Sequence, residues 1–141
     1  MPTKLPLLCA MSAALGLAGP NQASAQIVLG QAEAVDGDSL EMTGTSIRLF
    51  GVDAPEALQT CQRGGETWAC GQEAKAALAQ LTQGKPLRCE TRDHDKYGRS
   101  VATCYVGRVD LAATMVAAGL AVALPDFTTT YVEHEARARW S

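Results

Sequence analysis

Carboxylates gather at the ends of predicted strands in the first part of the chain. Asp36 and Asp38 are two residues apart in VDGDSL, and Asp53 and Glu56 follow the apolar stretch IRLFGV. Residues two apart on a strand face the same side, so the first two carboxylates can point to one place. Pro55 fixes its own φ and favours an extended residue before it, which holds Asp53 and Glu56 at a set separation. The pattern indicates carboxylates that hold a hard cation or orient a water molecule.

Two arginines accompany these carboxylates. Arg48 lies within the predicted strand SIRLFGV, and Arg99 begins the strand that follows DHDKYG. A guanidinium presents a planar fork of donors that matches phosphate oxygens, so two arginines can hold one phosphate from two sides. Phosphodiester hydrolysis also needs a base for the attacking water, and Glu56 can serve if it is not a metal ligand. The two histidines, His94 and His134, are not needed and are expected at the surface.

Short strands followed by helices are the elements that must position these residues. Turn signals at Asp36-Gly37 and Thr43-Gly44 separate the strand-like stretches QIVLGQAEAV, SLEM and SIRLFGV. CQRGGETWAC is expected to be a loop, and PLRCE and RSVATCYV are expected to form a long hairpin around DHDKYG. Helices are predicted over 72–83, over 111–118 with Asp110 as the cap, and over 130–140. This order predicts an α+β fold with a small closed or nearly closed barrel.

The N-terminus has the three parts of a secretory signal. Lys4 precedes the apolar run LPLLCAMSAALGLA, and Ala23-Ser24-Ala25 supplies an A-x-A cleavage site. We therefore expect a signal peptide over 1–25 and a single mature domain over 26–141. An uncleaved anchor is the alternative, but the run is short for a bilayer. The mature protein is expected to be a monomer, secreted or periplasmic, without membrane attachment.

Net charge and cysteine content narrow the class of protein to which the chain can belong. The formal charge is −3, and −4 without Lys4, which speaks against a protein that holds nucleic acid by a broad basic surface. The mature domain keeps an even set of cysteines, which suits disulfides in an exported chain: Cys61, Cys70, Cys89 and Cys104. The absence of a C-x-x-C pair argues against zinc. Three pairings are possible, and we expect Cys61 with Cys70 across a short loop and Cys89 with Cys104 across the hairpin arms.

Taken in order, these motifs resemble the thermonuclease family, whose type member is staphylococcal nuclease, and in particular its exported bacterial branch with cysteines. The resemblance covers nearly all of 32–140, through VDGDSLEM, IRLFGVDAPE, CGQEAKAAL, DHDKYGRSVATC and DLAATMVAAGLAVA. It implies an OB-fold barrel of five strands with three helices. It also implies a calcium-dependent nuclease that hydrolyses phosphodiester bonds of DNA and RNA, with single strands preferred.

The resemblance implies a role for each residue that matches a family motif. The implied calcium ligands are Asp38, Asp53 and the backbone carbonyl of Ala54. The implied catalytic residues are the general base Glu56 and the phosphate-binding Arg48 and Arg99. Lys96 and Tyr97 would border the nucleotide pocket.

The chain departs from the family pattern near its end. The stretch ALPDFTTTY has no clear match to the aromatic residues that line the nucleotide pocket of the type member, and the last helix is short before Trp140. A noncatalytic OB-fold module that binds single-stranded nucleic acid or a protein partner is the alternative, because this barrel also serves in that way. Such a module would be expected to carry a basic groove with several aromatic residues.

Overall fold

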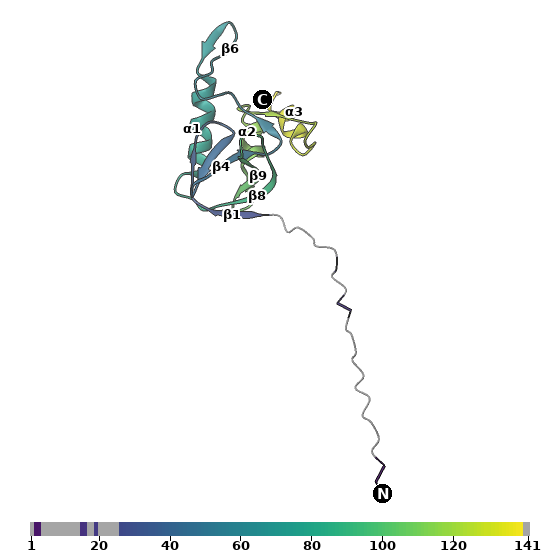
Figure 1. Ribbon diagram of the computed structural model, residues 1–141. Coiled ribbons are helices and arrows are strands. Elements are labelled where there is room, and N and C mark those ends of the chain that lie inside the picture. Colours follow the sequence, from purple (N-terminus) through teal and green to yellow (C-terminus); the bar gives the residue numbers. More distant parts are fainter. Residues whose placement is uncertain (1, 4–14, 17–18, 20–25, 140–141) are drawn as a thin grey trace.

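The structure is a computed structural model, and it describes residues 2–3, 15–16, 19 and 26–139. It is a mixed α+β fold with three helices in this part of the chain (Figure 1). Most of the expected signal peptide, including Cys9, and Trp140 lie outside the described residues. None of the helices in the described residues is long and apolar enough to cross a membrane.

The main sheet is built from antiparallel pairs and one parallel pair. Its hydrogen-bonded order is β1-β8-β9-β4-β3-β2, with β10 paired to β9, and only β4 and β9 run parallel among these described strands. The bounds are β1 Ile27–Gly30, β2 Ala32–Ala34, β3 Ser39–Met42, β4 Thr45–Leu49, β8 Leu87–His94, β9 Ser100–Val106 and β10 Val109–Asp110. Gln31 alone separates β1 from β2, so the segment 27–34 pairs with β8 by its first half and with β3 by its second.

Two small sheets stand beside the main one. β5 (Val52–Asp53) pairs with β11 (Val122–Ala123), which brings a segment from the last third of the chain next to Asp53. β6 (Cys61–Arg63) pairs with β7 (Glu66–Trp68), so the expectation of an irregular loop over CQRGGETWAC is wrong. The reason is Gly64-Gly65, whose φ angles of 58° and 81° form a two-residue hairpin turn. The hairpin projects beyond one end of the first helix (Figure 1).

The helices follow the predicted pattern with shifted ends. α1 runs over Cys70–Thr82, α2 over Leu111–Ala117 and α3 over Val132–Ala138. Asp110 caps α2, because its Oδ1 accepts a hydrogen bond from the backbone N of Ala113 at 3.2 Å. Its Oδ2 accepts from the hydroxyl of the buried Tyr131 at 2.9 Å, which ties the start of α3 to the start of α2. Burial, followed by the charge of Asp110, raises the pKa of Tyr131.

The core lies between the main sheet and the helices. Large apolar side chains from β3, β4, α1, β8 and α2 are fully buried there: Leu40, Ile47, Leu49, Leu78, Leu87, Leu111 and Met115. The disulfide between Cys89 and Cys104 crosses β8 and β9 inside this core, where the two residues are directly paired with Cα atoms 4.0 Å apart. The hairpin of β8 and β9 is thereby held at its base, and its free end carries the DHDKYG turn.

Candidate functional site

Arg48 joins the two carboxylates that the sequence analysis assigns to a metal ion. It lies in β4, opposite Ser39 of β3. Its Nη1 is 3.0 Å from Oδ2 of Asp38, and its Nη2 is 3.0 Å from Oδ1 of Asp53 and 3.3 Å from the carbonyl oxygen of Val52. Only 22% of the Arg48 side chain is exposed. One guanidinium in β4 thus joins the bend before β3, which carries Asp38, to β5, which carries Val52 and Asp53.

Asp38 is a buried carboxylate with a strongly perturbed pKa. Its Oδ2 accepts from the backbone N of Ala54 at 2.8 Å and its Oδ1 from the Ser39 hydroxyl at 3.0 Å. Burial and the hydrogen-bonded Asp36 raise the pKa of Asp38 to about 7, although Ala54 and Arg48 oppose this rise. Burial is therefore the main reason that the ionised form of Asp38 is disfavoured, and more positive charge beside the carboxylate would favour it. A divalent cation would supply that charge.

The turn before β3 positions Asp38 differently from the sequence expectation. Residues 35–38 form a bend, so the alternation of a regular strand does not apply to Asp36 and Asp38. Instead Oδ1 of Asp36 accepts from the backbone N of Asp38 at 3.1 Å. Gly37 fits tightly, since an added Cβ would lie 2.6 Å from Cβ of Ala74 in α1 and 2.8 Å from Cβ of Ala54.

The donor set around Arg48 fits a hard cation. Asp38 and Asp53 present carboxylate oxygens to the same guanidinium, and oxygen donors are the ones calcium prefers. No group of three or more His, Cys, Asp or Glu side chains comes together in the part of the chain described. The remaining ligands of such a cation would therefore be backbone carbonyls and water.

Glu56 lies in the loop between β5 and the β6–β7 hairpin, and its side chain is exposed to solvent. The backbone N of Gln59 donates to the carbonyl oxygen of Glu56 at 2.8 Å, and the backbone N of Glu56 donates to Oε1 of Gln59 at 3.2 Å. Within the described residues its carboxylate makes no hydrogen bond or ion pair. Gly71 of α1 packs against this loop so closely that an added Cβ would lie 1.8 Å from the carbonyl oxygen of Glu56. The start of α1 therefore fixes the backbone that carries Glu56.

Arg99 is positioned by Asp95 across the β8–β9 turn. Oδ2 of Asp95 accepts from Nε of Arg99 at 2.6 Å, and its Oδ1 accepts from the backbone N of Tyr97 at 2.9 Å and of Arg99 at 3.0 Å. Desolvation raises the pKa of Asp95, but these hydrogen bonds and the charge of Arg99 together outweigh it and lower the pKa. The carboxylate thus orders the turn and orients the guanidinium together.

Four of the expected residues line one cavity of about 250 Å³: Arg48, Lys96, Tyr97 and Arg99. Phe50 and Phe127 also line it, so an aromatic wall is present although ALPDFTTTY shows no clear match to the family's aromatic stretch. Phe127 is 67% exposed and Tyr97 is 73% exposed, which leaves both rings accessible. The wall also includes His94, which is exposed as expected. His134 is half-buried, and its ring centroid lies 6.4 Å from that of Tyr131.

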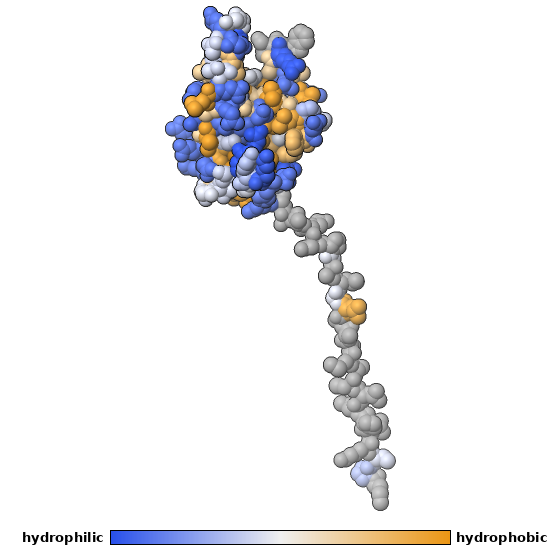
Figure 2. Space-filling view, turned by 45° about the horizontal axis from the view of Figure 1, so that its top comes forward, coloured by the Kyte–Doolittle hydropathy of each residue, from blue (hydrophilic) through white to orange (hydrophobic). Residues whose placement is uncertain are grey.

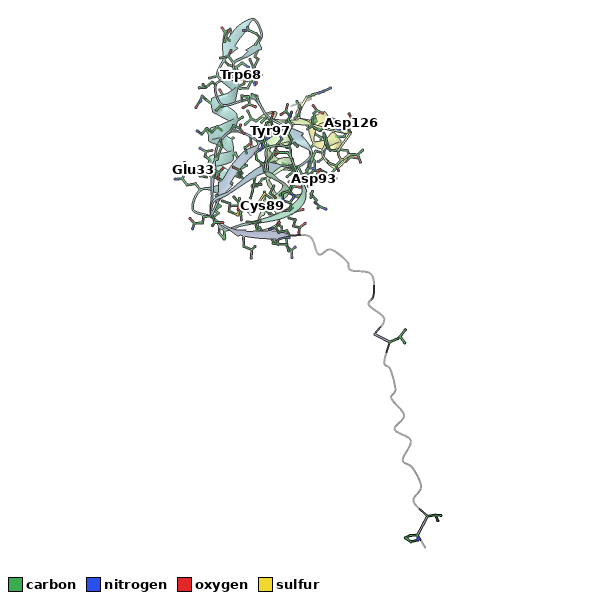
Figure 3. All side chains as sticks on the ribbon, viewed as in Figure 1. Glu33, Trp68, Cys89, Asp93, Tyr97 and Asp126 are labelled. Carbon is green, nitrogen blue, oxygen red and sulfur yellow. A yellow bond between two sulfur atoms is a disulfide. The ribbon has the colours of Figure 1, made fainter. Side chains whose placement is uncertain are left out.

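Asp53, the last residue of β5, and Ala54 after it lie in the wall of a second cavity of about 310 Å³. This cavity also contacts the disulfide between Cys61 and Cys70, whose Cα atoms are 5.6 Å apart. Both disulfides are the pairs that the sequence analysis expects. Figure 3 labels Trp68 of the hairpin and Tyr97 of the β8–β9 turn, which belong to the two different cavities.

Sequence reasoning missed residues that position the site without taking part in its motifs. Asp95, Gln59 and Gly71 hold the Arg99 and Glu56 loops, as described above. The spacing of Asp95 and Arg99 at i and i+4 around Lys-Tyr-Gly was a readable signal for the first. The close approach of Gly71 has no local signal, because its neighbour is fifteen residues away in the chain.

Comparisons with known proteins agree with the motifs. Residues 46–139 match the family model described as staphylococcal nuclease homologue. A succinoglycan biosynthesis protein from Rhizobium meliloti is 44% identical over 85 residues, which cover 58% of this chain and 44% of that protein. A probable staphylococcal-like nuclease from Oryza sativa subsp. japonica is 35% identical over 94 residues, which cover 67% and 24%. An uncharacterized endonuclease from Haemophilus influenzae is 30% identical over 98 residues, which cover 66% and 50%.

The chain thus spans half or less of the length of these three relatives. The family match itself covers about two thirds of the chain, from the strand that carries Arg48 to the end of the last helix. The chain belongs to the staphylococcal nuclease family.

Proposed function

We propose that the protein is a calcium-dependent nuclease that hydrolyses phosphodiester bonds of DNA and RNA and prefers single strands. The observation that carries the proposal is the position of Arg48, which lines the aromatic cavity with Arg99 and also contacts both Asp38 and Asp53. A phosphate held by the two arginines would lie beside the two carboxylates. Two of the relatives bear the names of nucleases, which supports the same class of reaction.

The proposed fold is a five-stranded OB-fold barrel with three helices. The segment 27–34 supports this reading, because it pairs with β8 and with β3, the strands next to the two ends of the sheet order. Counted as one bent strand, it would close the sheet on itself. We further propose that residues 1–25 are a signal peptide and that the domain over 26–141 is a monomer that acts outside the cytoplasm. The two disulfides support the location, because disulfides persist in oxidising compartments.

In the proposed site, Asp38, Asp53 and the carbonyl oxygen of Ala54 would hold calcium. The bound ion would neutralise charge on the phosphate and help to position it. Because Arg48 contacts the same two carboxylates, their transfer to a cation would free its guanidinium for phosphate oxygens. Arg99, held by Asp95, would take the other side of the phosphate and stabilise charge that develops in the transition state.

Glu56 is the proposed general base. Its solvent-exposed carboxylate has no hydrogen-bond or ion-pair partner within the described residues, so it is free to accept a proton from water. The loop that carries it is held through its backbone to Gln59 and the start of α1. A free base on a fixed backbone suits a reaction in which water must attack in line with the leaving oxygen.

The noncatalytic binding module remains the second candidate, because the exposed rings of Tyr97 and Phe127 suit base stacking without chemistry. Cleavage of denatured DNA and of RNA separates the two. The protein with oxidised cysteines should cleave both in calcium and neither in EGTA, and calcium added back should restore cleavage. Arg99→Ala should reduce turnover by about 10²-fold. Binding of single strands without calcium-dependent cleavage would establish the module instead.

A further inference from the structure

The cavity of about 310 Å³ on the Asp53 side of β5 has walls that suit a nucleobase. Asp53 is the only charged residue among the described residues that line it. Its other walls are apolar or neutral and include Pro55, Gln59, Trp68, Leu120 and Val122. Such a wall favours a flat, weakly polar group over a phosphate.

The two cavities meet along the small sheet of β5 and β11. Val52 lines the Arg48 cavity, whereas the next residue, Asp53, lines the second. On the paired strand, Val122 lies opposite Asp53 and lines the second cavity with it. Leu124, one residue beyond β11, lines the first cavity. Because the successive residues Val52 and Asp53 point to opposite faces, this sheet is a thin ridge between the cavities. Nη2 of Arg48 reaches Asp53 at 3.0 Å, so a phosphate bound at Arg48 would lie close to both cavities.

Trp68 supplies an aromatic wall on a tethered hairpin. It pairs with Cys61 in the β6–β7 register, and the disulfide from Cys61 joins the hairpin to Cys70, the first residue of α1. The ring is half-buried, which limits its movement. In Figure 2 the hairpin is the hydrophilic projection at the upper left of the folded part, with hydrophobic residues around its base.

Arg63 adds a cation beside this ring. Its Cζ lies 4.1 Å from the centroid of the Trp68 ring, and the side chain is exposed. No ion pair joins Arg63 to a carboxylate within the described residues. An aromatic ring next to an unpaired guanidinium is the combination that single-stranded nucleic acid uses, because bases stack on the ring and phosphates meet the cation.

We propose that this second cavity binds the nucleobase on the opposite side of the scissile phosphate from the Tyr97 cavity. Trp68 is its stacking surface, and Arg63 contacts the next phosphate along the strand. The proposal rests on the proposed nuclease function for the position of the scissile phosphate. It extends the substrate contact from one nucleotide to a short single strand that crosses the β5–β11 ridge.

Binding is tested with a phosphorothioate-linked octathymidylate in calcium, because these linkages slow hydrolysis. Trp140→Phe leaves Trp68 as the only tryptophan of the chain, so stacking should quench its fluorescence on titration. Anisotropy of the labelled oligomer should show that Trp68→Ala weakens binding about 10-fold, whereas Trp68→Phe weakens it less than threefold. Arg63→Ala should reduce the slope of log K against log salt by about 0.7. Arg108, also an exposed arginine, lies in the β9–β10 turn; Arg108→Ala is the control and should leave the slope unchanged.

Cleavage compares octathymidylate with thymidine 5′-(4-nitrophenyl phosphate), which carries one nucleoside. Trp68→Ala should reduce kcat/KM for the oligomer at least five times more than for the ester. An equal fall for both would make Trp68 a structural residue and overturn the proposal, as would unchanged binding without quenching. If the oligomer quenches Trp68 but the wild-type protein cleaves neither substrate, the nuclease function fails and the single-strand binding surface stands. If both are cleaved and Trp68→Ala changes nothing, the nuclease function stands and the second cavity is not a subsite.

Discussion

Gly71→Ala should displace the loop that carries Glu56. The added Cβ would lie 1.8 Å from the carbonyl oxygen of Glu56 and 2.9 Å from the carbonyl carbon and oxygen of Ala57. Side-chain Cβ atoms do not approach other atoms closer than 3.0 Å, so the helix start and the loop must separate by more than about 1 Å, and neither partner is a flexible side chain. A misplacement of about 1 Å at a reacting group costs on the order of 10²-fold in rate.

The same substitution should also destabilise the fold. Overpacking costs about 1–3 kcal/mol, and the better helix propensity of alanine returns at most about 1 kcal/mol. Urea unfolding measures the free energy of unfolding, and initial rates on denatured DNA in calcium measure turnover. We expect Gly71→Ala to lose about 1–2 kcal/mol and about 10- to 100-fold in turnover.

Gly107→Ala is the matched control. Gly107 has a φ of 58° in the β9–β10 turn, and an added Cβ would meet no atom within 4 Å. Its replacement should cost about 1 kcal/mol of stability through backbone strain but should leave turnover within twofold. If Gly71→Ala stays folded and retains turnover within twofold of wild type, the close contact with Glu56 does not position a reacting group, and the reasoning is wrong.

Three further perturbations test the supports of the site. Asp95→Asn should reduce turnover about 10-fold, because the charge that orients Arg99 is lost. Since the folded pKa of Asp95 is lowered, its stabilisation is present above the ordinary carboxyl pKa and is lost as pH falls through the folded value. The difference in Tm between wild type and Asp95→Asn should therefore shrink on acidification, and a difference that grows would contradict this assignment. Asp110→Ala should lower the free energy of unfolding, measured in urea, by about 1–2 kcal/mol, because α2 loses its cap and the Tyr131 hydroxyl loses its partner. Turnover of the folded fraction should stay within twofold of wild type, and a larger fall would show that α2 positions the site. Replacing Cys89 and Cys104 by alanine should cost about 3 kcal/mol, as expected for a crosslink of sequence separation 15, and nonreducing peptide mapping of wild type should give this pair; a peptide that joins Cys104 to another cysteine would refute it.

The turns and caps of this fold could be predicted from local residue types. Thr43 and Gly44 have φ angles of 48° and 79°, which suits the two-residue turn expected from Thr-Gly between β3 and β4. Asp110 caps α2 and Gly119 ends it with a φ of 72°, as the signals indicate. Each of these features depends on one or two neighbouring residues, so the sequence contains the whole signal.

The arrangement around Arg48 could be predicted only in part. The order of the motifs indicates that Arg48, Asp38 and Asp53 belong to one site. The contact of one guanidinium with both carboxylates depends on the register between β3 and β4, which local residue types do not specify. The close packing of Gly37 on α1 depends on residues far apart in the chain and has no local signal. The β6–β7 hairpin was missed for another reason: the cysteines at its ends suggested a closed loop, although Gly64-Gly65 is a strong turn signal.

Single-turnover cleavage by Glu56→Gln tests the central claim most directly. The carboxylate is exposed and without a hydrogen-bond or ion-pair partner within the described residues, so its amide should leave the free energy of unfolding within about 0.5 kcal/mol of wild type. With saturating single-stranded DNA and calcium, the account predicts a cleavage rate about 10²- to 10⁴-fold lower with binding within threefold of wild type. A rate within threefold of wild type at equal binding would contradict the assignment of Glu56 as the base.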